Sequence, residues 1–262
     1  MLFSFVIPTY NRSEKVRRAI DSILVQPNWS ECSEIVIVDD GSTDNTENSL
    51  QHYLKHDQIR LIKHDTNGGV AKAKNTGISN ALNTYVVLLD SDDLLNDGGL
   101  AYLKNLVLNN DYDLFFCGTK ALAGNKLLYD PQFNGTKTYS DLLRTSVGEY
   151  LPVCRTTLLK DNLLSNLRGY ESVTWLNLAK NGSKLYFDRE AIRLYDEDGD
   201  DRLSNRFNGI RNSIKMRDGY RFYLNEFGTD LKNHNYKEYL KIRIKLSCYN
   251  ILGFVQLKLE HN

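Results

Sequence analysis

The sequence predicts an α/β fold with a mostly parallel central sheet flanked by helices. Three observations lead to this prediction. Short apolar segments alternate with amphipathic segments of helical period through the first part of the chain. The spacing of these segments suits right-handed crossovers between parallel strands. The apolar segment over 84–89 is hydrophobic on both sides, as a buried parallel strand must be.

The first unit of this pattern is a strand over 3–8 followed by a helix. Behind the strand, apolar residues recur at the spacing of one helix face: Val16, Ala19, Ile20, Ile23 and Leu24. Asn11 and Glu14 stand three residues apart at the predicted start of this helix. We therefore expect these two residues to form a capping pair.

The strand and helix pattern then repeats and becomes less regular. Strands are predicted over 34–38, 59–62, 84–89, 113–118, 184–188 and 191–195. Helices are predicted from Asp44 and over 69–82, 139–145 and 171–180, the last ending at the stop signal Asn181-Gly182. From Arg211 the chain is basic and helical. The predicted domains are therefore a core over 1–205 and a helical C-terminal extension over 206–262.

The composition narrows the possible classes of protein. The 33 basic residues balance 33 acidic ones, so no global attraction to nucleic acid is expected. Four cysteines are scattered singly, which argues against a cysteine metal site or a disulfide framework. No basic segment precedes the apolar residues 2–9, and no apolar run approaches the roughly 20 residues of a membrane span. We expect a cytoplasmic protein that binds no nucleic acid.

Acidic residues at a strand end are the main functional signal. Asp90 and Asp92 follow the strand over 84–89, and residues i and i+2 of an extended chain point to the same side. Two carboxylates facing one crevice repel each other, which favours a bound divalent cation. Oxygen ligands favour Mg²⁺ or Mn²⁺, with phosphate oxygens completing the coordination. The plain alternative is that these residues only cap the helix that follows.

Other strand ends carry polar residues that suit a nucleotide. Asp40 would accept the imide N–H of a uracil, and Tyr10 would stack on the base. Gly69 permits close approach of the backbone, and Lys74 supplies positive charge near phosphate. The alternatives are an ordinary turn rich in Asp, Gly and Ser around Asp40, and a solvated surface lysine at position 74.

Four sequence segments place these residues in one known family. In chain order they read FVIPTYNR, IVIVDDGSTDNT, NGGVAKAKNTG and VVLLDSDD. Their order and spacing resemble family 2 glycosyltransferases, which have the GT-A fold, a Rossmann-like α/β architecture. Four ordered motifs are more specific than any one of them. The resemblance runs from Leu2 to about Ser204 and is strongest before Asp93.

The resemblance implies that a nucleotide-sugar lies across the strand ends. The donor-binding residues would be Pro8, Thr9, Tyr10, Asp40, Gly69, Lys74, Asp90 and Ser91. Asp92 would ligate Mn²⁺ or Mg²⁺, and Asp93 would support this metal site. The family usually has arginine at the position of Lys74. Lysine keeps the charge but lacks the bidentate geometry.

The resemblance also implies the reaction, a metal-dependent transfer of hexosyltransferase type. The donor would be a nucleoside-diphosphate sugar, with UDP the expected nucleotide. The acceptor would be a hydroxyl of a glycan or lipid-linked molecule in surface polysaccharide synthesis. Glu171 is the candidate base, because it matches the second position of the family's ED pair. Its alternative is a first-turn glutamate favoured by the helix dipole. No second nucleophile is evident, so inversion is expected.

The chain departs from the family pattern at two places, and the role of its C-terminal segment is open. Tyr170 replaces the first acid of the ED pair, and the histidine that many relatives carry is absent from the stretch 195–202. Both departures allow a non-catalytic nucleotide-sugar binding module as the alternative function. Arg202 and Arg206 are candidate diphosphate contacts. The basic and aliphatic segment over 236–258 would either lie on the inner face of a membrane or pack on the core or another subunit.

Overall fold

The computed structural model describes residues 1–124, 126–145, 148–167, 172–197 and 212–260. The chain forms two compact units. The first comprises Met1–Lys137, Val147–Leu164 and Leu178–Glu197, and the second comprises Thr138–Ser146, Ser165–Asn177 and Asp198–Asn262. The predicted domain boundary at 205–206 lies outside the described residues and stays a prediction.

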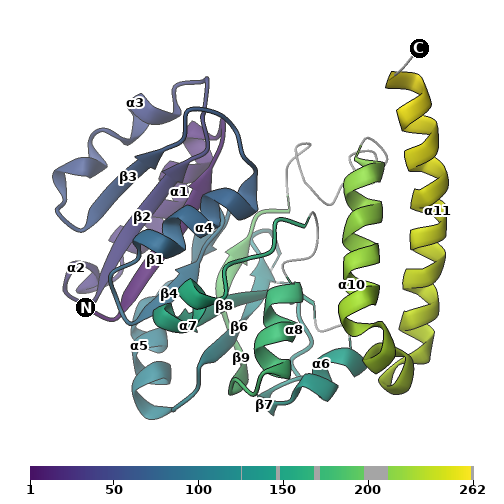
Figure 1. Ribbon diagram of the computed structural model, residues 1–262. Helices are drawn as coiled ribbons and strands as arrows, with labels where there is room; N and C mark the ends of the chain where they lie inside the picture. Colours follow the sequence, from purple (N-terminus) through teal and green to yellow (C-terminus); the bar gives the residue numbers. More distant parts are fainter. Residues whose placement is uncertain (125, 146–147, 168–171, 198–211, 261–262) are drawn as a thin grey trace. The chain divides into compact units, whose positions relative to one another are not determined.

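The first unit contains a sheet whose leading strands are parallel (Figure 1). These strands are β1 (Phe3–Thr9), β2 (Ser33–Asp39), β3 (Ile59–Lys63) and β4 (Tyr85–Leu88), in the spatial order β3-β2-β1-β4. Thr9 pairs with Asp39, and Asp39 pairs with Lys63. The carboxyl ends of these three strands are therefore level, and the residues that follow them meet at one edge of the sheet.

Beyond β4 the sheet is mixed. β8 (Tyr150–Arg155) lies antiparallel between β4 and β6 (Leu114–Ala121), and β6 runs parallel to β9 (Leu185–Tyr195). β5 (Leu94–Leu95) and β7 (Gly135–Lys137) pair antiparallel with β9. The α/β prediction is confirmed, but parallel pairing dominates only in the first half of the sheet.

The two strands predicted over 184–188 and 191–195 form one strand, β9. The strand stays continuous because its polar middle bulges away from β6. Phe116 pairs with Phe187 and Gly118 with Ala191, so three residues of β9 lie opposite one residue of β6. Such a bulge removes the intervening residues from the ladder without ending the strand.

Helices cover both faces of the parallel strands. α1 (Ser13–Leu24) packs on the face that carries Phe5, and α4 (Val70–Asn80) packs on the opposite face, where Gly77 contacts Val6. The remaining helices of the first unit are α2 (Trp29–Cys32), α3 (Thr46–Leu50), η1 (Tyr53–Lys55), α5 (Gly99–Asn109) and α7 (Thr156–Asp161). Buried apolar side chains of β1, β2, β4, α1 and α5 form one continuous core.

The predicted capping pair of α1 is wrong. The residue before the helix is Arg12, and its side chain makes no capping hydrogen bond. Asn11 has φ of 52°, in the left-handed region that asparagine tolerates, and its side chain points to the loop after β2 instead. The predicted stop of α8 (Ser172–Lys180) is confirmed, because Gly182 has φ of 89° and its N–H bonds to Ala179.

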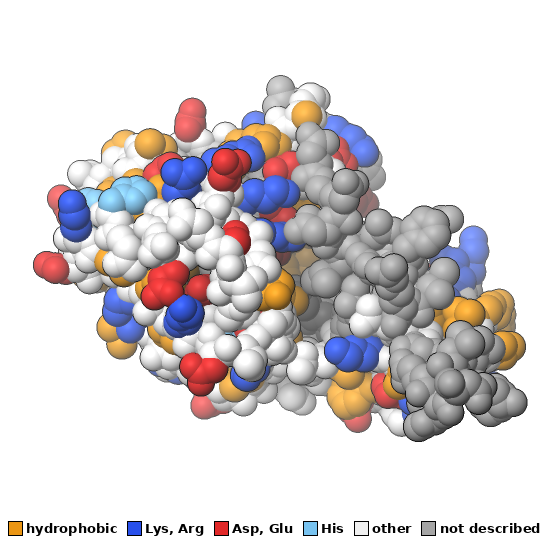
Figure 2. Space-filling model, turned by 90° about the horizontal axis from the view of Figure 1, so that it is seen from above, with side chains coloured by type: hydrophobic (Ala, Val, Ile, Leu, Met, Phe, Trp, Pro, Cys, Tyr) orange, Lys and Arg blue, Asp and Glu red, His pale blue; other side chains and the backbone are white. Residues whose placement is uncertain are grey.

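The second unit is helical, as predicted for the C-terminal extension. It contains α6 (Tyr139–Arg144), the first two turns of α8, α10 (Ser213–His234) and α11 (Tyr236–Glu260). Its core gathers Leu143, Val173, Leu176, Tyr220, Phe227, Leu231 and Ile242. Within the described part of the chain, every helix is too short or too polar to cross a bilayer. Figure 2 shows acidic and basic side chains interspersed, in keeping with the zero net charge.

Candidate active site

The ends of β1, β2 and β3 bring their following residues into one row. The backbone N–H of Asp40 donates to the carbonyl of Thr9 at 2.8 Å, and the N–H of His64 donates to the carbonyl of Asp39 at 2.9 Å. Asp40 and His64 are thus neighbours because each is the first residue after a strand in a level, parallel arrangement. The first three strand ends form one edge of the candidate site.

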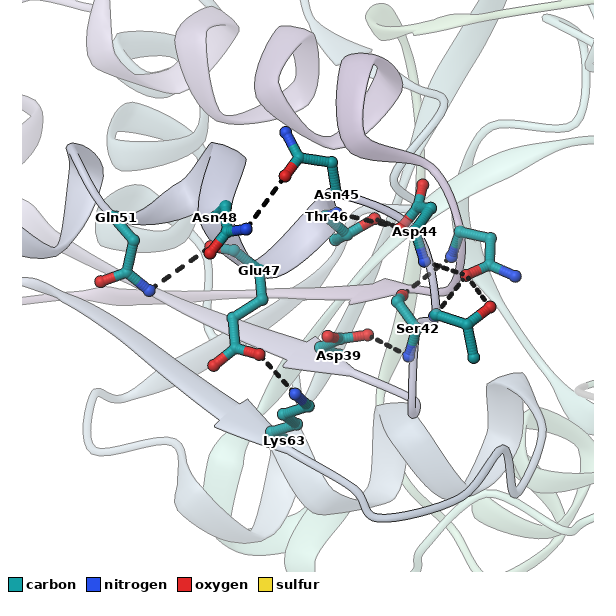
Figure 3. Close-up of polar contacts among 11 residues, drawn as sticks. Asp39, Ser42, Asp44, Asn45, Thr46, Glu47, Asn48, Gln51 and Lys63 are labelled. Atoms are coloured by element: carbon teal, nitrogen blue, oxygen red, sulfur yellow. Dashed lines mark hydrogen bonds and ion pairs between the residues drawn. The ribbon is translucent and has the colours of Figure 1, made fainter.

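The loops after β1 and β2 are joined by Asn11. Its Oδ1 accepts hydrogen bonds from the backbone N–H groups of Thr43 at 2.8 Å and Asp44 at 3.3 Å. Figure 3 shows that Asp39 and Asp44 form hydrogen bonds within the loop after β2. Asp39 accepts from the N–H of Ser42 at 2.9 Å, and Asp44 accepts from the N–H of Thr46, the first residue of α3, at 2.9 Å. Asp39 and Asp44 therefore shape the turn.

Asp40 joins the loop after β2 to the start of α4. Its carboxylate accepts from the N–H groups of Gly68 at 3.0 Å and Gly69 at 2.7 Å, and it lies 2.7 Å from Nδ1 of His64. Nε2 of His64 lies 2.9 Å from the hydroxyl of Thr76 on α4. Asp40 is only 2% exposed. It holds the glycine loop in place, and its predicted contact with a base stays a prediction.

Each carboxylate of the segment after β4 faces a different cation. Lys74 of α4 lies 2.9 Å from Asp90, and Arg12 lies 2.8 Å from Asp92. The guanidinium of Arg193, on β9, lies 3.4 Å from Asp93. The formal charges of the three acidic and three basic side chains balance. Contacts therefore join the four motifs in a ring. Asn11 links the first motif to the second, and Asp40 links the second to the third. Lys74 links the third motif to the fourth, and Asp92 links the fourth back to the first.

The pair of Lys74 and Asp90 is ionised. Lys74 is 3% exposed, so it is not a solvated surface lysine, and a buried ammonium requires a partner of opposite charge. Burial disfavours the charged form of Asp90. The ammonium of Lys74 outweighs this effect and holds the pKa of the carboxyl below its ordinary value. The side chain of Asp90 is nevertheless 35% exposed and accessible from the solvent.

Asp92 and Asp93 have raised pKa values. Burial and the charge of Asp90 raise the pKa of Asp92, although Arg12 opposes them. Burial raises the pKa of Asp93 to about 8, against the opposing charge of Arg193. Ionising all three carboxylates together is therefore unfavourable in the protein alone. A group with additional positive charge would relieve this repulsion.

Arg193 is a second buried cation of the site, besides Lys74. It is 4% exposed, and besides Asp93 it contacts the hydroxyl of Thr119 at 2.9 Å and the carboxylate of Glu149 at 3.3 Å. These contacts tie Asp93 to β6 and β9 in the second half of the sheet. Asp93 itself is fully buried, which suits a supporting role behind Asp92.

The donor atoms of the acidic segment fit a divalent cation of the Mg²⁺ type. Asp90 and Asp92 are partly exposed carboxylates, with 35% and 22% of their side chains accessible. No group of three or more His, Cys, Asp or Glu side chains within the described ranges is arranged to hold a metal. Mg²⁺ commonly takes one or two protein carboxylates and completes its shell with water and substrate phosphates. The residues therefore fit a cation that binds together with a diphosphate.

The other predicted site residues differ in accessibility. Tyr10 is 41% exposed and open to a ligand, whereas Thr9 and Ser91 are at most 3% exposed and Pro8 is buried. Gly69 donates its N–H to Asp40, so this amide is occupied in the protein alone. Glu171, Tyr170, Arg202 and Arg206 lie outside the described residues, and their predicted roles stay predictions.

Three residues of this site were not predicted from the sequence. Arg12 stands inside the first motif, but only the fold brings it to Asp92. His64 directly follows β3, and the level strand ends could have identified it as a neighbour of Asp40. Arg193 interrupts an apolar strand, and a charge predicted to be buried requires a partner, which is the signal that could have found it.

The arrangement of fold and site defines the class of this protein. The model of glycosyl transferase family 2 matches residues 4–167. This match covers more than half of the chain, and the chain belongs to that family. The strand-end motifs that predicted the family are the same residues that form the ring of contacts described above.

Two relatives show how much of the chain is similar to individual glycosyltransferases. The chain is 30% identical to the putative teichuronic acid biosynthesis glycosyltransferase TuaG of Bacillus subtilis, over 74% of this chain and 78% of TuaG. It spans only 40% of the length of another relative, glycosyltransferase GlyG of Streptococcus pneumoniae, at 34% identity over 49% of this chain. The match to GlyG thus covers less than half of that relative.

Solved structures support the fold. The chain superposes on TarS 1–349 of S. aureus in complex with UDP-GlcNAc with a TM-score of 0.73, at 21% identity, covering 97% of this chain and 73% of that one. At this identity the similarity concerns the fold alone. The GT-A architecture predicted from the motifs is therefore confirmed.

Proposed function

We propose that this protein is an inverting glycosyltransferase that moves a sugar from a nucleoside-diphosphate sugar, with UDP the nucleotide we expect, to a hydroxyl group. The observation that carries the proposal is the ring of contacts among the four strand-end motifs. Together with the pair of Arg193 and Asp93, it places three carboxylates and three cations at the edge where ligands of open α/β sheets bind. A divalent cation would relieve the repulsion among the carboxylates, and a diphosphate that binds with it would face the charges of Lys74 and Arg12.

The nucleotide assignment rests on the exposed residues of the first motifs and on relatives. Tyr10 offers an exposed ring near the ends of β1 and β2. The complex of TarS contains UDP-GlcNAc, and this supports a UDP-sugar as the first donor to test. The relative TuaG is named for teichuronic acid biosynthesis, which supports an acceptor in surface polysaccharide or lipid-linked glycan assembly.

Residues of the chain would perform most of the chemistry. A base removes the proton of the acceptor hydroxyl as it attacks the anomeric carbon, and Glu171 is our candidate. Lys74 and Arg12 pair with the acidic segment. When the donor binds, their positive charges would also attract the diphosphate. Asp90 and Asp92 would hold Mn²⁺ or Mg²⁺, which when bound neutralises charge on the leaving diphosphate. A single displacement inverts the anomeric configuration.

Donor binding is tested by thermal stability. The purified chain is heated with UDP-sugars and GDP-sugars, each with Mn²⁺, Mg²⁺ or a chelator. A donor at a hundredfold excess over its Kd stabilises by about 2.7 kcal/mol, which raises Tm by about 5 to 10 °C. Stabilisation should require both the donor and the cation. The absence of any shift with every donor would contradict the proposal.

Variants separate the roles of the site residues. Asp92→Asn should abolish the cation-dependent shift, whereas Asp65→Asn, the same change at an exposed acid outside the ring, should retain it. Glu171→Gln should abolish transfer and leave donor binding unchanged. Unaltered turnover in Glu171→Gln would refute the base assignment. Donor binding by the unsubstituted chain without transfer to any acceptor would favour the alternative, a non-catalytic binding module.

A further inference from the structure

Helix α11 carries apolar side chains on two of its faces, one buried and one exposed. Its inner face carries Ile242, which belongs to the core cluster that α11 shares with α10, and the partly buried Tyr239, Leu246 and Tyr249, which pack against this cluster. The aromatic ring of Tyr249 stacks on Tyr220 of α10, with centroids 5.5 Å apart. This inner face explains why the helix is attached to the second unit. It leaves the opposite face available for another partner.

The outer face carries a strip of exposed apolar side chains. Tyr236, Leu240, Ile244 and Ile251 are 55%, 41%, 63% and 68% exposed. Their spacing of four, four and seven residues places all four within an arc of about 80° on a helix with 3.6 residues per turn. A surface groove runs along this strip. Hydrophobic side chains gather at the right-hand edge in Figure 2, on the side where Figure 1 places α11. Exposed apolar side chains gathered on one side of a helix form a candidate interaction surface.

Basic residues border the strip on both sides. At 100° per residue, Arg243 lies along one edge, and Lys237 and Lys241 lie along the other. The segment 236–253 carries four basic residues and one acidic residue, a net charge of +3 (4 − 1). The one acidic residue, Glu238, lies 2.8 Å from Lys241 and offsets its charge, so Lys237 and Arg243 supply the positive charge of the two margins. The strip therefore presents an apolar centre between positive margins.

This charge pattern selects among possible partners. A second copy of the helix would bring positive margins against positive margins, and such like-charge contacts oppose pairing. An anionic lipid surface supplies acyl chains for the apolar centre and negative headgroups for both margins. We propose that the outer face of α11 docks on an anionic membrane surface, with the helix lying in the plane of the headgroups.

Apolar and basic side chains would each contribute to the affinity for the membrane. The apolar side chains would enter the boundary between headgroups and acyl chains, while Lys and Arg extend their charges to the headgroups. Each basic residue close to an anionic surface increases binding by about fivefold. Replacing two of them should therefore weaken binding by about 25-fold, and salt should weaken it further.

Co-sedimentation of the full chain with vesicles tests the proposal. The vesicles consist of an equal mixture of phosphatidylglycerol and phosphatidylcholine, or of phosphatidylcholine alone. We expect binding to the mixture and little binding to phosphatidylcholine. Leu240→Gln with Ile244→Gln should remove the apolar part of binding, and Lys237→Gln with Arg243→Gln should remove the charge part. Far-ultraviolet circular dichroism verifies that both double variants remain helical.

Matched controls change the same residue types elsewhere. Leu82→Gln with Leu108→Gln alters two exposed leucines of the first unit, and Lys104→Gln with Lys160→Gln alters two exposed lysines there. Both control variants should bind the mixed vesicles like the unsubstituted chain. Equal binding to both vesicle types, or no loss in the α11 variants, would overturn the proposal. So would a dimer in sedimentation velocity that the α11 variants dissociate, because a second copy would then occupy the face.

Discussion

Gly77 allows α4 to lie close to the sheet, and this position offers a quantitative test of the fold. A Cβ atom at Gly77 would stand 2.3 Å from Cγ1 of Val6 and 3.3 Å from Cγ2 of Val38, where ordinary contacts begin at 3.4 Å. Gly77→Ala therefore requires a shift of about 1 Å in α4 or a new rotamer of Val6, at a cost of about 2 to 4 kcal/mol. The better helix propensity of alanine returns about 1 kcal/mol. The expected net loss of unfolding free energy is about 1 to 3 kcal/mol.

Thermal unfolding measures this loss, and a double variant isolates its cause. Tm should fall by about 3 to 10 °C in Gly77→Ala. In the background of Val6→Ala the same change should be neutral or stabilising by up to about 1 kcal/mol, because the obstructing methyl groups are gone. Ser79→Ala, at an exposed position of the same helix, should alter stability by less than about 0.5 kcal/mol. An unchanged or higher Tm in Gly77→Ala would refute the close packing of α4 on β1.

Three further predictions concern polar side chains of the first unit. The native pKa of Asp93, about 8, lies above that of the unfolded chain, so the stability it contributes is present below about pH 4 and is lost as pH rises through 8. Asp93→Asn should therefore gain up to about 4 kcal/mol relative to the metal-free unsubstituted chain as pH rises from 5 to 9 in urea titrations; parallel pH curves would contradict this. Glu34 is 4% exposed and accepts hydrogen bonds from Ser4 and Arg60, at the ends of the strands away from the site. Glu34→Ala should lower the free energy of unfolding by about 2 to 4 kcal/mol without changing the donor Kd. A higher donor Kd would contradict a purely structural role of Glu34. His64→Ala should weaken donor binding by about 1 to 3 kcal/mol in calorimetry, whereas His64→Asn, which can still donate to Asp40, should largely restore it; equal affinities of the two variants would exclude a positioning role.

The sequence could predict the parallel half of the sheet because the information there is local. Each strand of that half is a short apolar run, and each helix has its own periodicity. The level carboxyl ends then follow from parallel pairing, so Asp40 and Asp90 could be assigned to one edge of the sheet from the sequence. The mixed half was harder to predict. β8 contains Pro152 and enters the sheet antiparallel between β4 and β6, a placement that depends on pairing with strands distant in sequence.

The partners of the polar site residues depend on the tertiary structure. Asn11 was expected to cap α1, but it bonds to Thr43 and Asp44, because its left-handed backbone turns the side chain toward the second loop. Lys74 was as compatible with solvent as with phosphate until α4 buried it against Asp90. Side-chain contacts of this kind depend on distances between segments, which the order of residues along the chain does not specify.

Sequence alone determined the family, the α/β class and the chemical types present at the strand ends, because apolar period and motif order are properties of neighbouring residues. Only the tertiary structure decided which cation faces which carboxylate and which side of α11 remains exposed. Both outcomes depend on packing between distant segments, where burial makes an unpaired charge costly and leaves one arrangement favoured.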